Sequence, residues 1–509
     1  MSSKILSAAT FGLDSQLIEV EADLIGEAAK FIIVGLPDLA VQEAKERVRS
    51  AIKNSGWAFP RTKLTINLAP ADLKKYGPAF DLPIALAILL AKNYLSLSEE
   101  DNRAIYVGEL ALNGDLRPVN GIISIALLLK EQGLKRLYLP KANAAEASLI
   151  RGLEIFPLAN LKQLIDHCQR KILIKAQPFS KVKINQKESA AFAYQKIKGQ
   201  NQAKRALEIA AAGNHNLLMI GPPGSGKTLL ARALPELLPP LTLAEALEVT
   251  KIYSVSGQLP KDQPLITRRP FRSPHHTASG IALVGGGSFP KPGEITLAHR
   301  GVLFLDELSE FPRTVLENLR QPLEDGIVTI SRASQTLQFP ARFTLIAAAN
   351  PCPCGYLTDT EKECKCTTGE ILKYQKRISG PLLDRFDLQI EVPRLKFIEL
   401  QSQTTDNEVK NIIANVSQAR EIQLKRFKNN KLKNIYTNSE ISSQNIEQLC
   451  PLDDRCRQLL KEAMYKLQLS ARSYHRLIKV SRTIADLAQS EEIKTDHLAE
   501  ALQYRINQN

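Results

Sequence analysis

The sequence predicts an α/β protein with two sheet-containing domains followed by a helical C-terminal part. Residues 1–175 alternate short apolar runs with helical patterns, residues 197–395 contain apolar runs that end in polar residues, and the chain from 396 to 509 reads as helical. The polar, lysine-rich stretch 176–196 separates the first two parts as a linker. A chain of 509 residues is long enough for about three domains, each with its own core.

Composition narrows the class of protein. Hydrophobic residues make up 44% of the chain, yet no apolar run approaches the length needed to span a membrane, and the N-terminus lacks the apolar segment of a signal peptide. Four of the seven cysteines crowd into 352–366, unlike a secreted disulfide framework, so a reducing cytoplasm is expected. The net charge of +14 favours a polyanionic partner such as nucleic acid, although basic proteins without such a partner also exist.

The first domain is expected to contain strands at 31–35, 63–69, 104–110 and 134–140 and a helix at 81–90. The stretches GPAFDLPIALAILLA, YVGELALNGDLRPVNGI and LKRLYLPKANAAEA resemble the protease domain of Lon. That family has a serine where this chain has Ala79 and a lysine where it has Ile123, so the nucleophile and its base are both missing. The resemblance therefore implies a non-proteolytic domain that serves either as an oligomer scaffold or as a nucleic-acid platform.

Residues 215–232, HNLLMIGPPGSGKTLLAR, form the central motif of the second domain. An apolar strand at 217–220, a glycine-rich loop and a helix beginning at Lys227 are the context of a phosphate-binding P-loop rather than of a plain glycine turn. Lys227 is predicted to contact the β- and γ-phosphates of ATP, and the Thr228 hydroxyl to ligate Mg²⁺. The predicted nucleotide-binding residues of the loop are Gly221, Pro222, Pro223, Gly224, Ser225, Gly226, Lys227, Thr228 and Leu229.

Two further apolar strands end in polar residues that suit ATP hydrolysis. The strand in GVLFLDEL, at 301–308, ends in Asp306, predicted to hold Mg²⁺, and Glu307, predicted to orient or deprotonate the attacking water. FTLIAAANP, at 343–351, ends in Asn350, whose neutral amide can hold that water. The alternatives are a solvated acidic pair and an asparagine that merely ends a strand.

SGPLLDRFDLQIEV, at 379–392, carries Arg385. Hydrolysis needs a cation at the γ-phosphate, and AAA+ ATPases commonly take it from the adjacent subunit. The segment resembles the LLDRF stretch of magnesium-chelatase-type ATPases, which implies that Arg385 is an arginine finger rather than a solvated arginine. Asn350 similarly matches the sensor 1 position of AAA+ proteins.

Cys352, Cys354, Cys364 and Cys366 form a C-x-C-x9-C-x-C pattern directly after Asn350. Two close pairs of thiolates on a loop can make a tetrahedral sulfur site, which zinc favours. The spacing is tighter than the usual C-x2-C pattern, and free surface cysteines are the alternative. A zinc ion here would be structural.

Several segments are candidate DNA contacts or lid residues. The glycine-rich stretch 270–300 and a hairpin at 328–344, with Arg332 near its tip, suit loops that approach a phosphate backbone. The helical part is expected to carry a basic strip, formed by Lys410, Arg420, Lys425, Arg426, Lys428, Lys431 and Lys433. By resemblance to chelatase-like lids, Arg472 falls at the sensor 2 position of nucleotide binding, with Arg476 one helical turn away as the alternative.

The order of a Lon-like domain, an AAA+ core containing FRSPHHTASGIALVGGG and FPKPGEITLAHRGVLFLDEL, and a helical end containing LIKVSRTIADLA resembles the ComM/YifB type of magnesium-chelatase-like AAA+ ATPases along the whole chain. That resemblance implies a hexameric helicase that uses ATP and Mg²⁺ to promote branch migration of DNA during homologous recombination in natural transformation, with single-stranded and duplex or branched DNA as its partner. The alternatives are a magnesium-chelatase motor subunit, a regulatory protease and a binding protein without hydrolysis. The missing serine and lysine count against the protease, and the complete set of hydrolytic residues counts against the last.

Overall fold

The computed structural model describes residues 2–180, 192–287, 290–332, 335–401, 405–432, 435–466 and 469–505. Contacts divide the chain into two compact units. The first consists of Met1–Lys183 together with Leu243–Ile266, and the second of Ile184–Thr242 together with Thr267–Asn509. Among the described residues, no helix has the length and apolar character to cross a membrane.

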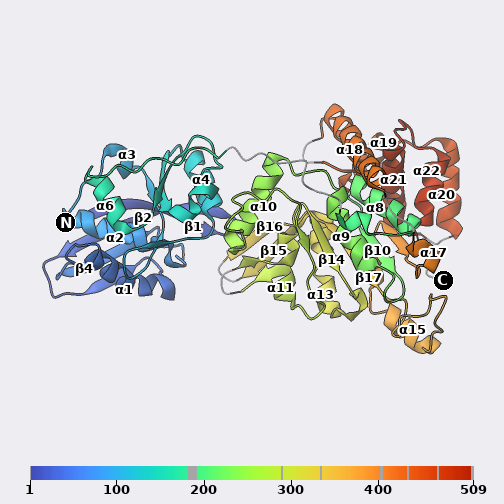
Figure 1. Cartoon of the computed structure of the whole chain (residues 1–509), viewed down its shortest axis with the longest axis horizontal. Helices are drawn as coiled ribbons and strands as arrows, with labels where there is room; N and C mark the ends of the chain where they lie inside the picture. Colours follow the sequence, from blue (N-terminus) through green and yellow to red (C-terminus); the bar gives the residue numbers. More distant parts are fainter. Residues whose placement is uncertain are drawn as a thin grey trace. The chain divides into compact units, whose positions relative to one another are not determined.

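Unit 1 is a seven-stranded sheet with helices packed against it (Figure 1). The strand order is β3 (Phe31–Val34), β4 (Lys63–Ala69), β2 (Asp14–Ile25), β1 (Ser2–Phe11), β5 (Ile105–Tyr106), β8 (Arg136–Pro140) and β9 (Glu154–Leu158). The main helices are α1 (Leu39–Asn54), α2 (Asp81–Ala91) and α4 (Ile122–Glu131). The predicted strands at 31–35, 63–69 and 134–140 and the helix at 81–90 are confirmed, while 104–110 divides into β5 and β6 (Glu109–Leu110).

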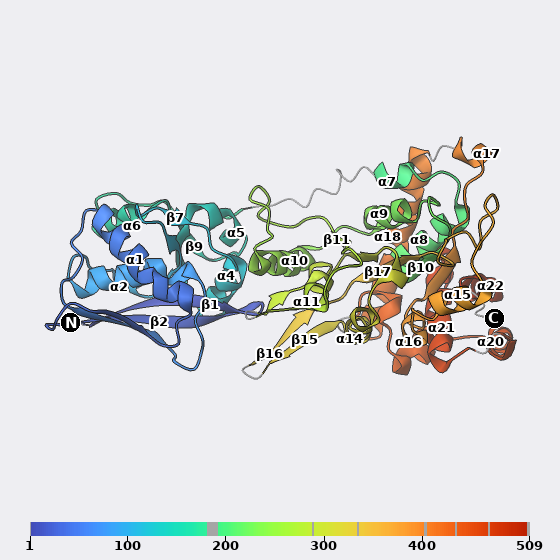
Figure 2. The ribbon, with the colours of Figure 1, turned by 90° about the horizontal axis from the view of Figure 1, so that it is seen from below.

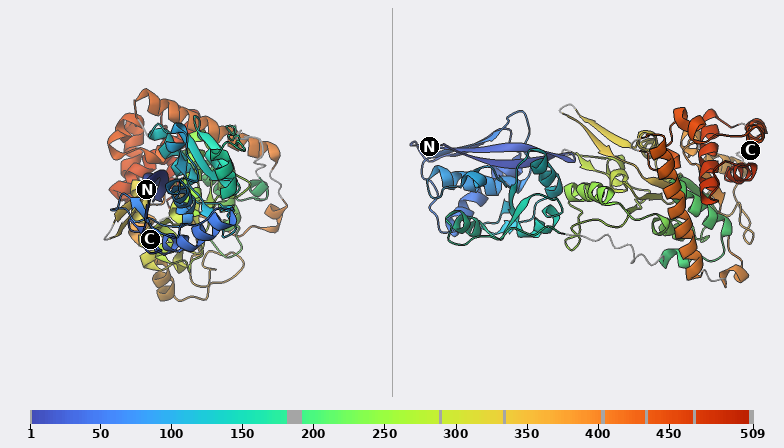
Figure 3. Two further views of the ribbon diagram at one scale, coloured as in Figure 1. Left: turned by 90° about the vertical axis from the view of Figure 1, so that its left-hand side faces the viewer. Right: turned by 90° about the horizontal axis from the view of Figure 1, so that it is seen from above.

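The long antiparallel hairpin of β1 and β2 was not predicted from the sequence. Its ladder runs from Ser2 opposite Asp23 to Phe11 opposite Asp14, and Figure 3 shows it as the longest pair of strands in this unit. Ile5 and Val20 face each other and are buried. The alternation of apolar and polar residues expected of a strand is obscured in the sequence because Ser7 is also buried. Its hydroxyl donates to the Tyr106 carbonyl at 2.9 Å.

Helix α10 (Leu243–Ser256) follows the P-loop helix in sequence but packs within unit 1. The Gly121 N–H donates to the hydroxyl of Ser254 at 3.0 Å, and that hydroxyl donates to the buried carboxylate of Glu146. Burial raises the pKa of Glu146. Lys251 pairs with Asp14 at 2.7 Å. The sequence had assigned this stretch to the 197–395 domain, because helical periodicity does not reveal which sheet a helix packs on.

The positions of the missing protease residues are apolar in unit 1. Ala79 packs in the same apolar cluster as Leu247 of α10. Ile123 is fully buried, and its N–H donates to the Glu146 carboxylate at 3.2 Å. Neither position offers a nucleophile or a base, in agreement with a non-proteolytic domain.

Unit 2 is built on a five-stranded parallel sheet in the order β11 (Phe271–Arg272), β14 (Val302–Leu305), β17 (Thr344–Ala349), β10 (Leu217–Ile220) and β18 (Leu388–Glu391). β10 therefore lies between two strands that come much later in the chain. Helices α8 (Asn201–Gly213) and α9 (Lys227–Leu237) flank it. Residues of β10, β14 and β17 are almost entirely buried, as expected for a parallel sheet covered on both faces.

The C-terminal helices share one apolar core with this sheet. They are α18 (Asp406–Asn429), α20 (Asp454–Lys466), α21 (Ala471–Leu487) and α22 (Thr495–Gln503), and α18 and α21 both pack on α8. Leu217 of β10, Phe427 of α18 and Ile484 of α21 belong to the same cluster of buried residues. Hydrophobic burial therefore holds the C-terminal helices against the sheet.

A buried ionic cluster adds to this packing and yields a stability prediction. Asp486 accepts from Arg426 at 3.1 Å and from Arg482 at 3.1 Å, and the Asp486 and Arg482 side chains are almost inaccessible. We expect Asp486→Ala to lower the free energy of unfolding by about 3–5 kcal/mol, because two guanidinium groups lose their counter-ion. Urea unfolding followed by circular dichroism measures the change, and Asp454→Ala, an exposed acid on α20, is the matched control that should change it little.

Candidate active site

The loop between β10 and α9 has the backbone of a phosphate cradle. Gly224 and Gly226 adopt φ values of 80° and 91°, which side chains disfavour. A Cβ at Gly221 would meet the Val392 carbonyl oxygen at 2.1 Å. No side chain among the described residues caps the first turn of α9, and the N–H groups of that turn are directed at the loop. The loop is therefore shaped to surround an anion.

Lys227 lies inside this cradle. Its Nζ donates to the carbonyls of Gly221 and Pro222 at 2.7 and 2.9 Å and lies 3.5 Å from Oδ1 of Asn350. Burial lowers the pKa of Lys227, and the charge of Asp306 partly opposes this shift. The buried hydroxyl of Ser225 has no hydrogen-bond partner within the described chain. A phosphate would give both groups an acceptor, so these residues fit the γ- and β-phosphates of a nucleotide.

Thr228 and Asp306 come together as the sequence predicts for an Mg²⁺ site. The Thr228 hydroxyl donates to Oδ2 of Asp306 at 2.9 Å, although the residues are 78 positions apart. The other carboxylate oxygen of Asp306 accepts the Glu307 N–H at 3.0 Å. A hydroxyl and a carboxylate at the rim of a phosphate loop are suitable oxygen ligands for Mg²⁺.

Glu307 has a partner that the sequence analysis missed. Its backbone lies in the left-handed region with φ 52°, and its carboxylate lies 3.1 Å from Nδ1 of His276. His276 packs edge-on against Phe311 and lies against the ring of His275. The sequence analysis placed His276 in a candidate DNA loop, whereas the structure places its ring beside Glu307. The sequence shows only two adjacent histidines at this point, and that pattern does not predict a contact between His276 and Glu307.

These residues meet because of the sheet topology. The P-loop follows β10, Asp306 and Glu307 follow β14, and Asn350 follows β17, and all three strands run parallel. Their carboxyl ends lie at one edge of the sheet, where ligands of open α/β sheets bind. The predicted hydrolytic set of a single chain is thus assembled at that edge, apart from its arginines.

The candidate arginines lie at the opposite edge. Their contacts are with residues that directly precede strands. The side chain of Asn216, just before β10, donates to the Arg385 carbonyl at 3.0 Å. Asp387, just before β18, pairs with Arg476 at 3.0 Å. Arg385 and Arg472 share one counter-ion, Glu324, at 2.6 and 3.2 Å. Four-residue β10 alone separates the two edges by about 13 Å. Neither Arg385 nor Arg472 is therefore placed to contact the nucleotide of its own chain.

Arg385 is buried as well as paired. Its side chain is 5% exposed, burial lowers its pKa, and its Nε lacks a hydrogen-bond partner among the described residues. Arg472 is 59% exposed. A cleft of about 890 Å³ opens beside this group, and its lining includes Glu324, Arg342, Arg472, His475, Arg476 and Lys479. Its charged lining is mixed, because Asp325, Asp387 and Glu440 also lie beside it, so the acids match the arginines and the lysine in number.

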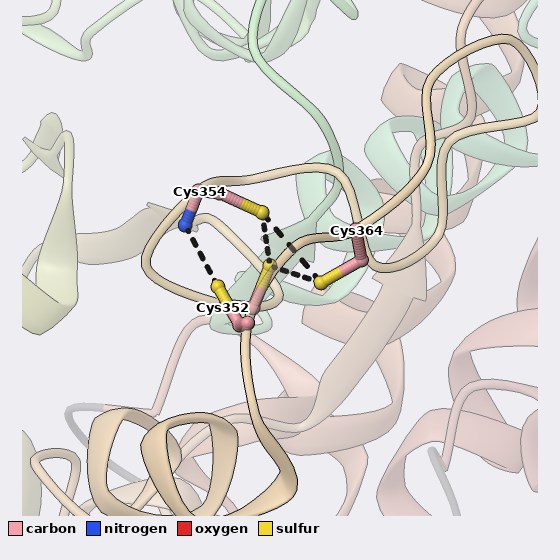
Figure 4. Close-up of side chains that lie close together, drawn as sticks. Cys352, Cys354 and Cys364 are labelled. Atoms are coloured by element: carbon pink, nitrogen blue, oxygen red, sulfur yellow. Dashed lines mark hydrogen bonds between the residues drawn. The ribbon is translucent and has the colours of Figure 1, made fainter.

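The four cysteines converge, as the spacing predicts. Their sulfur atoms lie within 4.8 Å of one another, and Figure 4 shows the thiols of Cys352, Cys354 and Cys364 directed at a common centre. The Cys354 N–H donates to the sulfur of Cys366 at 3.4 Å. Backbone N–H groups of Tyr356 and Lys365 lower the pKa of Cys354 to about 6. Burial raises the pKa of Cys352 and, against the hydrogen bond from the Cys354 N–H, that of Cys366, so the fit to a metal ion rests on the convergence of the four sulfur atoms.

The structure describes the two loop segments that the sequence analysis proposed as DNA contacts to different extents. The hairpin is confirmed as β15 (Ile327–Arg332) and β16 (Gln335–Pro340) and extends away from the sheet of unit 2 (Figure 2). The side chain of Arg332 lies outside the described ones. In the glycine-rich stretch, β12 (Gly285–Gly286) pairs with β13 (Lys291–Pro292), and a Cβ at Gly285 would meet the Lys291 carbonyl oxygen at 2.4 Å.

The basic strip on α18 is only partly available to a partner. Arg420 donates to the Ala211 carbonyl at 2.7 Å, and Arg426 pairs with Asp486, so these two arginines stabilise the fold. Both arginines are only partly exposed, and sequence spacing cannot distinguish an arginine held by the fold from a fully solvated one. Lys433 lies outside the described residues. The remaining members, Lys410, Lys425, Lys428 and Lys431, are exposed.

One sheet carries the P-loop, the acidic pair after β14 and the polar residue after β17, and a helical C-terminal part packs beside it. This arrangement defines a protein of the AAA+ ATPase class. The family described as magnesium chelatase, subunit ChlI, matches residues 193–400, and its related descriptions match residues 20–143 and 406–505. The chain belongs to the magnesium-chelatase-like family of the ComM and YifB proteins.

Two relatives match along nearly the full length of the chain, and a third matches less than half of it. Competence protein ComM of Haemophilus influenzae is 45% identical over 505 residues, covering 98% of this chain and 97% of its own. The YifB protein of Escherichia coli is 43% identical over 505 residues, covering 99% and 97%. The magnesium-chelatase 38 kDa subunit of Cereibacter sphaeroides is 25% identical over 224 residues, covering 41% of this chain and 60% of its own.

Proposed function

We propose that the chain is a cytoplasmic, ATP-driven DNA motor that works as a hexameric ring and promotes branch migration during recombination in natural transformation. The observation that carries the proposal is the division of the hydrolytic residues between two edges of one sheet. Lys227, Asp306, Glu307 and Asn350 lie at the carboxyl edge, and Arg385 and Arg472 lie at the amino edge. Head-to-tail assembly of identical chains would join one edge to the other, and such contacts form a ring when the rotation between neighbours closes.

In this proposal each residue has a limited task. The P-loop N–H groups and Lys227 bind the phosphates, Thr228 and Asp306 hold Mg²⁺, and Glu307 with Asn350 orients the attacking water. ATP and Mg²⁺ supply the transferred phosphoryl group and the neutralisation of its charge. Arg385 of the neighbouring chain leaves Glu324 for the γ-phosphate, where its unsatisfied Nε gains an acceptor. The four cysteines are proposed to hold a structural Zn²⁺.

DNA is the proposed track of the motor. The chain carries a net charge of +14, and the exposed lysines of α18 and the β15–β16 hairpin offer contacts to a phosphate backbone. The relative named competence protein ComM supports a role in natural transformation. The alternative is the motor subunit of a metal chelatase, which the partial match to a magnesium-chelatase subunit favours.

A DNA-dependent ATPase assay separates these two functions. We expect single-stranded or branched DNA to raise the rate of ATP hydrolysis several-fold, and this stimulation to decline steeply with salt because binding releases counter-ions from the backbone. Lys227→Ala should hydrolyse ATP in neither condition. Unchanged hydrolysis with every DNA form, together with no measurable DNA binding by fluorescence anisotropy at modest salt, would contradict the motor on DNA and favour the chelatase.

A further inference from the structure

The cysteine loop lies directly against the phosphate loop. Gly355, between the two cysteine pairs, adopts φ 83°, and a Cβ added there would come within 2.7 Å of Cδ of Pro223 and 3.8 Å of Cγ of Asn350. There is no room for a side chain between the two loops. The backbone next to Cys354 is therefore in contact with one wall of the nucleotide site.

Two further contacts fasten the same loop within unit 2. Asp359, whose side chain is inaccessible, pairs with Arg394 just after β18, with Nη2 and Nε of the arginine at 2.8 and 3.1 Å from Oδ2. The Gln375 amide, at the end of α15 (Thr368–Gln375), donates to the Pro351 carbonyl at 3.2 Å. The loop thus connects Asn350, directly after β17, with the backbone that follows β18.

Apolar packing does not explain how this loop holds its shape. Residues 358–363 read TDTEKE, and of the four cysteines only Cys352 is buried. Three sulfur–sulfur distances are 3.4, 3.6 and 3.6 Å, joining Cys352, Cys354 and Cys364. A tetrahedral zinc site with zinc–sulfur bonds of about 2.3 Å has sulfur atoms about 3.8 Å apart. The cluster is close to that size, so a metal can supply the missing cross-link.

We infer that a zinc ion bound by Cys352, Cys354, Cys364 and Cys366 holds Asn350 and the Pro223 side of the P-loop in the geometry for hydrolysis, so that metal loading controls ATP turnover. Asn350 is only two residues from the first ligand, and a released loop would free both Asn350 and the contact at Gly355. Lys227 and the remaining P-loop groups hold the phosphates without help from the cysteines. Loss of zinc therefore lowers the rate of hydrolysis far more than the affinity for nucleotide. The control of turnover rests on the proposed ATPase, whereas the metal site itself does not.

The test uses the purified full-length protein and a Cys352→Ser, Cys354→Ser double variant. Elemental analysis should find about one zinc per wild-type chain and almost none in the variant. The variant should hydrolyse ATP at least about tenfold more slowly while its affinity for a fluorescent ADP analogue changes less than about threefold, as expected for a lost positioning group. Trypsin should cleave at Lys362 and Lys365 faster in the variant. Cys168→Ser, in unit 1, is the matched control and should behave as wild type.

Each outcome decides one part of the inference. A wild-type chain without bound zinc overturns the metal site. If the wild type binds zinc at full occupancy, but turnover and tryptic cleavage are unchanged in the double variant, the proposed control of ATP hydrolysis by the metal is overturned. If zinc-loaded wild type hydrolyses no ATP at all, the proposed ATPase fails, while zinc content and tryptic protection still report whether the metal orders the loop.

Discussion

Glu307→Gln is expected to bind ATP with nearly unchanged affinity and to hydrolyse it at least about 100-fold more slowly than wild type. A positioned general base contributes about 10²–10⁴-fold to a reaction, and glutamine keeps the size of the side chain while losing its basicity. Glu307 directly follows Asp306, whose carboxylate accepts a hydrogen bond from the P-loop residue Thr228, and its own carboxylate lies 3.1 Å from Nδ1 of His276. Phosphate release measures turnover, and titration with a fluorescent ATP analogue measures affinity.

The matched control for this prediction is Glu310→Gln. Glu310 is three residues further along the same segment and pairs with Arg377 at 3.0 Å, away from the P-loop. It should keep near wild-type turnover. Lys227→Ala should differ from both, because losing the lysine removes a phosphate contact and weakens nucleotide binding itself. Rapid hydrolysis by Glu307→Gln would mean that another group activates the water.

The residues at the carboxyl edge of the sheet could be found in the sequence because each directly follows an apolar strand. Gly221, Asp306 and Asn350 all stand immediately after a run of buried residues, and parallel strands bring such positions together whatever the rest of the fold does. The residues of the candidate nucleotide site at the carboxyl edge could therefore be predicted from the positions of the strand ends alone. The same reasoning locates the cysteine cluster, since four thiols within 15 residues have few ways to remain apart.

Other features depend on contacts that sequence periodicity does not encode. Arg385 stands in a recognisable segment, but its burial against Glu324 arises from a residue 61 positions away. His276 reaches Glu307 only because β11 and β14 are neighbours in the sheet. Helix α10 shows why the domain boundary was missed, since its apolar face is compatible with either sheet. In each case the deciding partner is distant in sequence.

Arg385→Ala is expected to abolish hydrolysis in a ring of identical variants and to recover it when mixed with Glu307→Gln. An arginine finger contributes about 10³–10⁵-fold to the rate of phosphoryl transfer. In an equimolar random ring, about a quarter of the interfaces join an intact Glu307 to an intact Arg385 of the next chain, so the mixture should reach up to about a quarter of wild-type turnover. If Arg385 served its own chain, mixing two inactive variants would restore nothing.

Because Arg385 is buried, its loss must be separated from misfolding. Nucleotide affinity and the circular dichroism spectrum of Arg385→Ala should match those of wild type, and Arg457→Ala, an exposed arginine on α20, should leave turnover unchanged. Arg472→Ala provides an independent variant, since that side chain is 59% exposed and shares Glu324 with Arg385. It should also be rescued by Glu307→Gln, because the two arginines lie on one face. Rescue of neither variant, with both folded and able to bind ATP, would contradict a shared site between neighbouring chains.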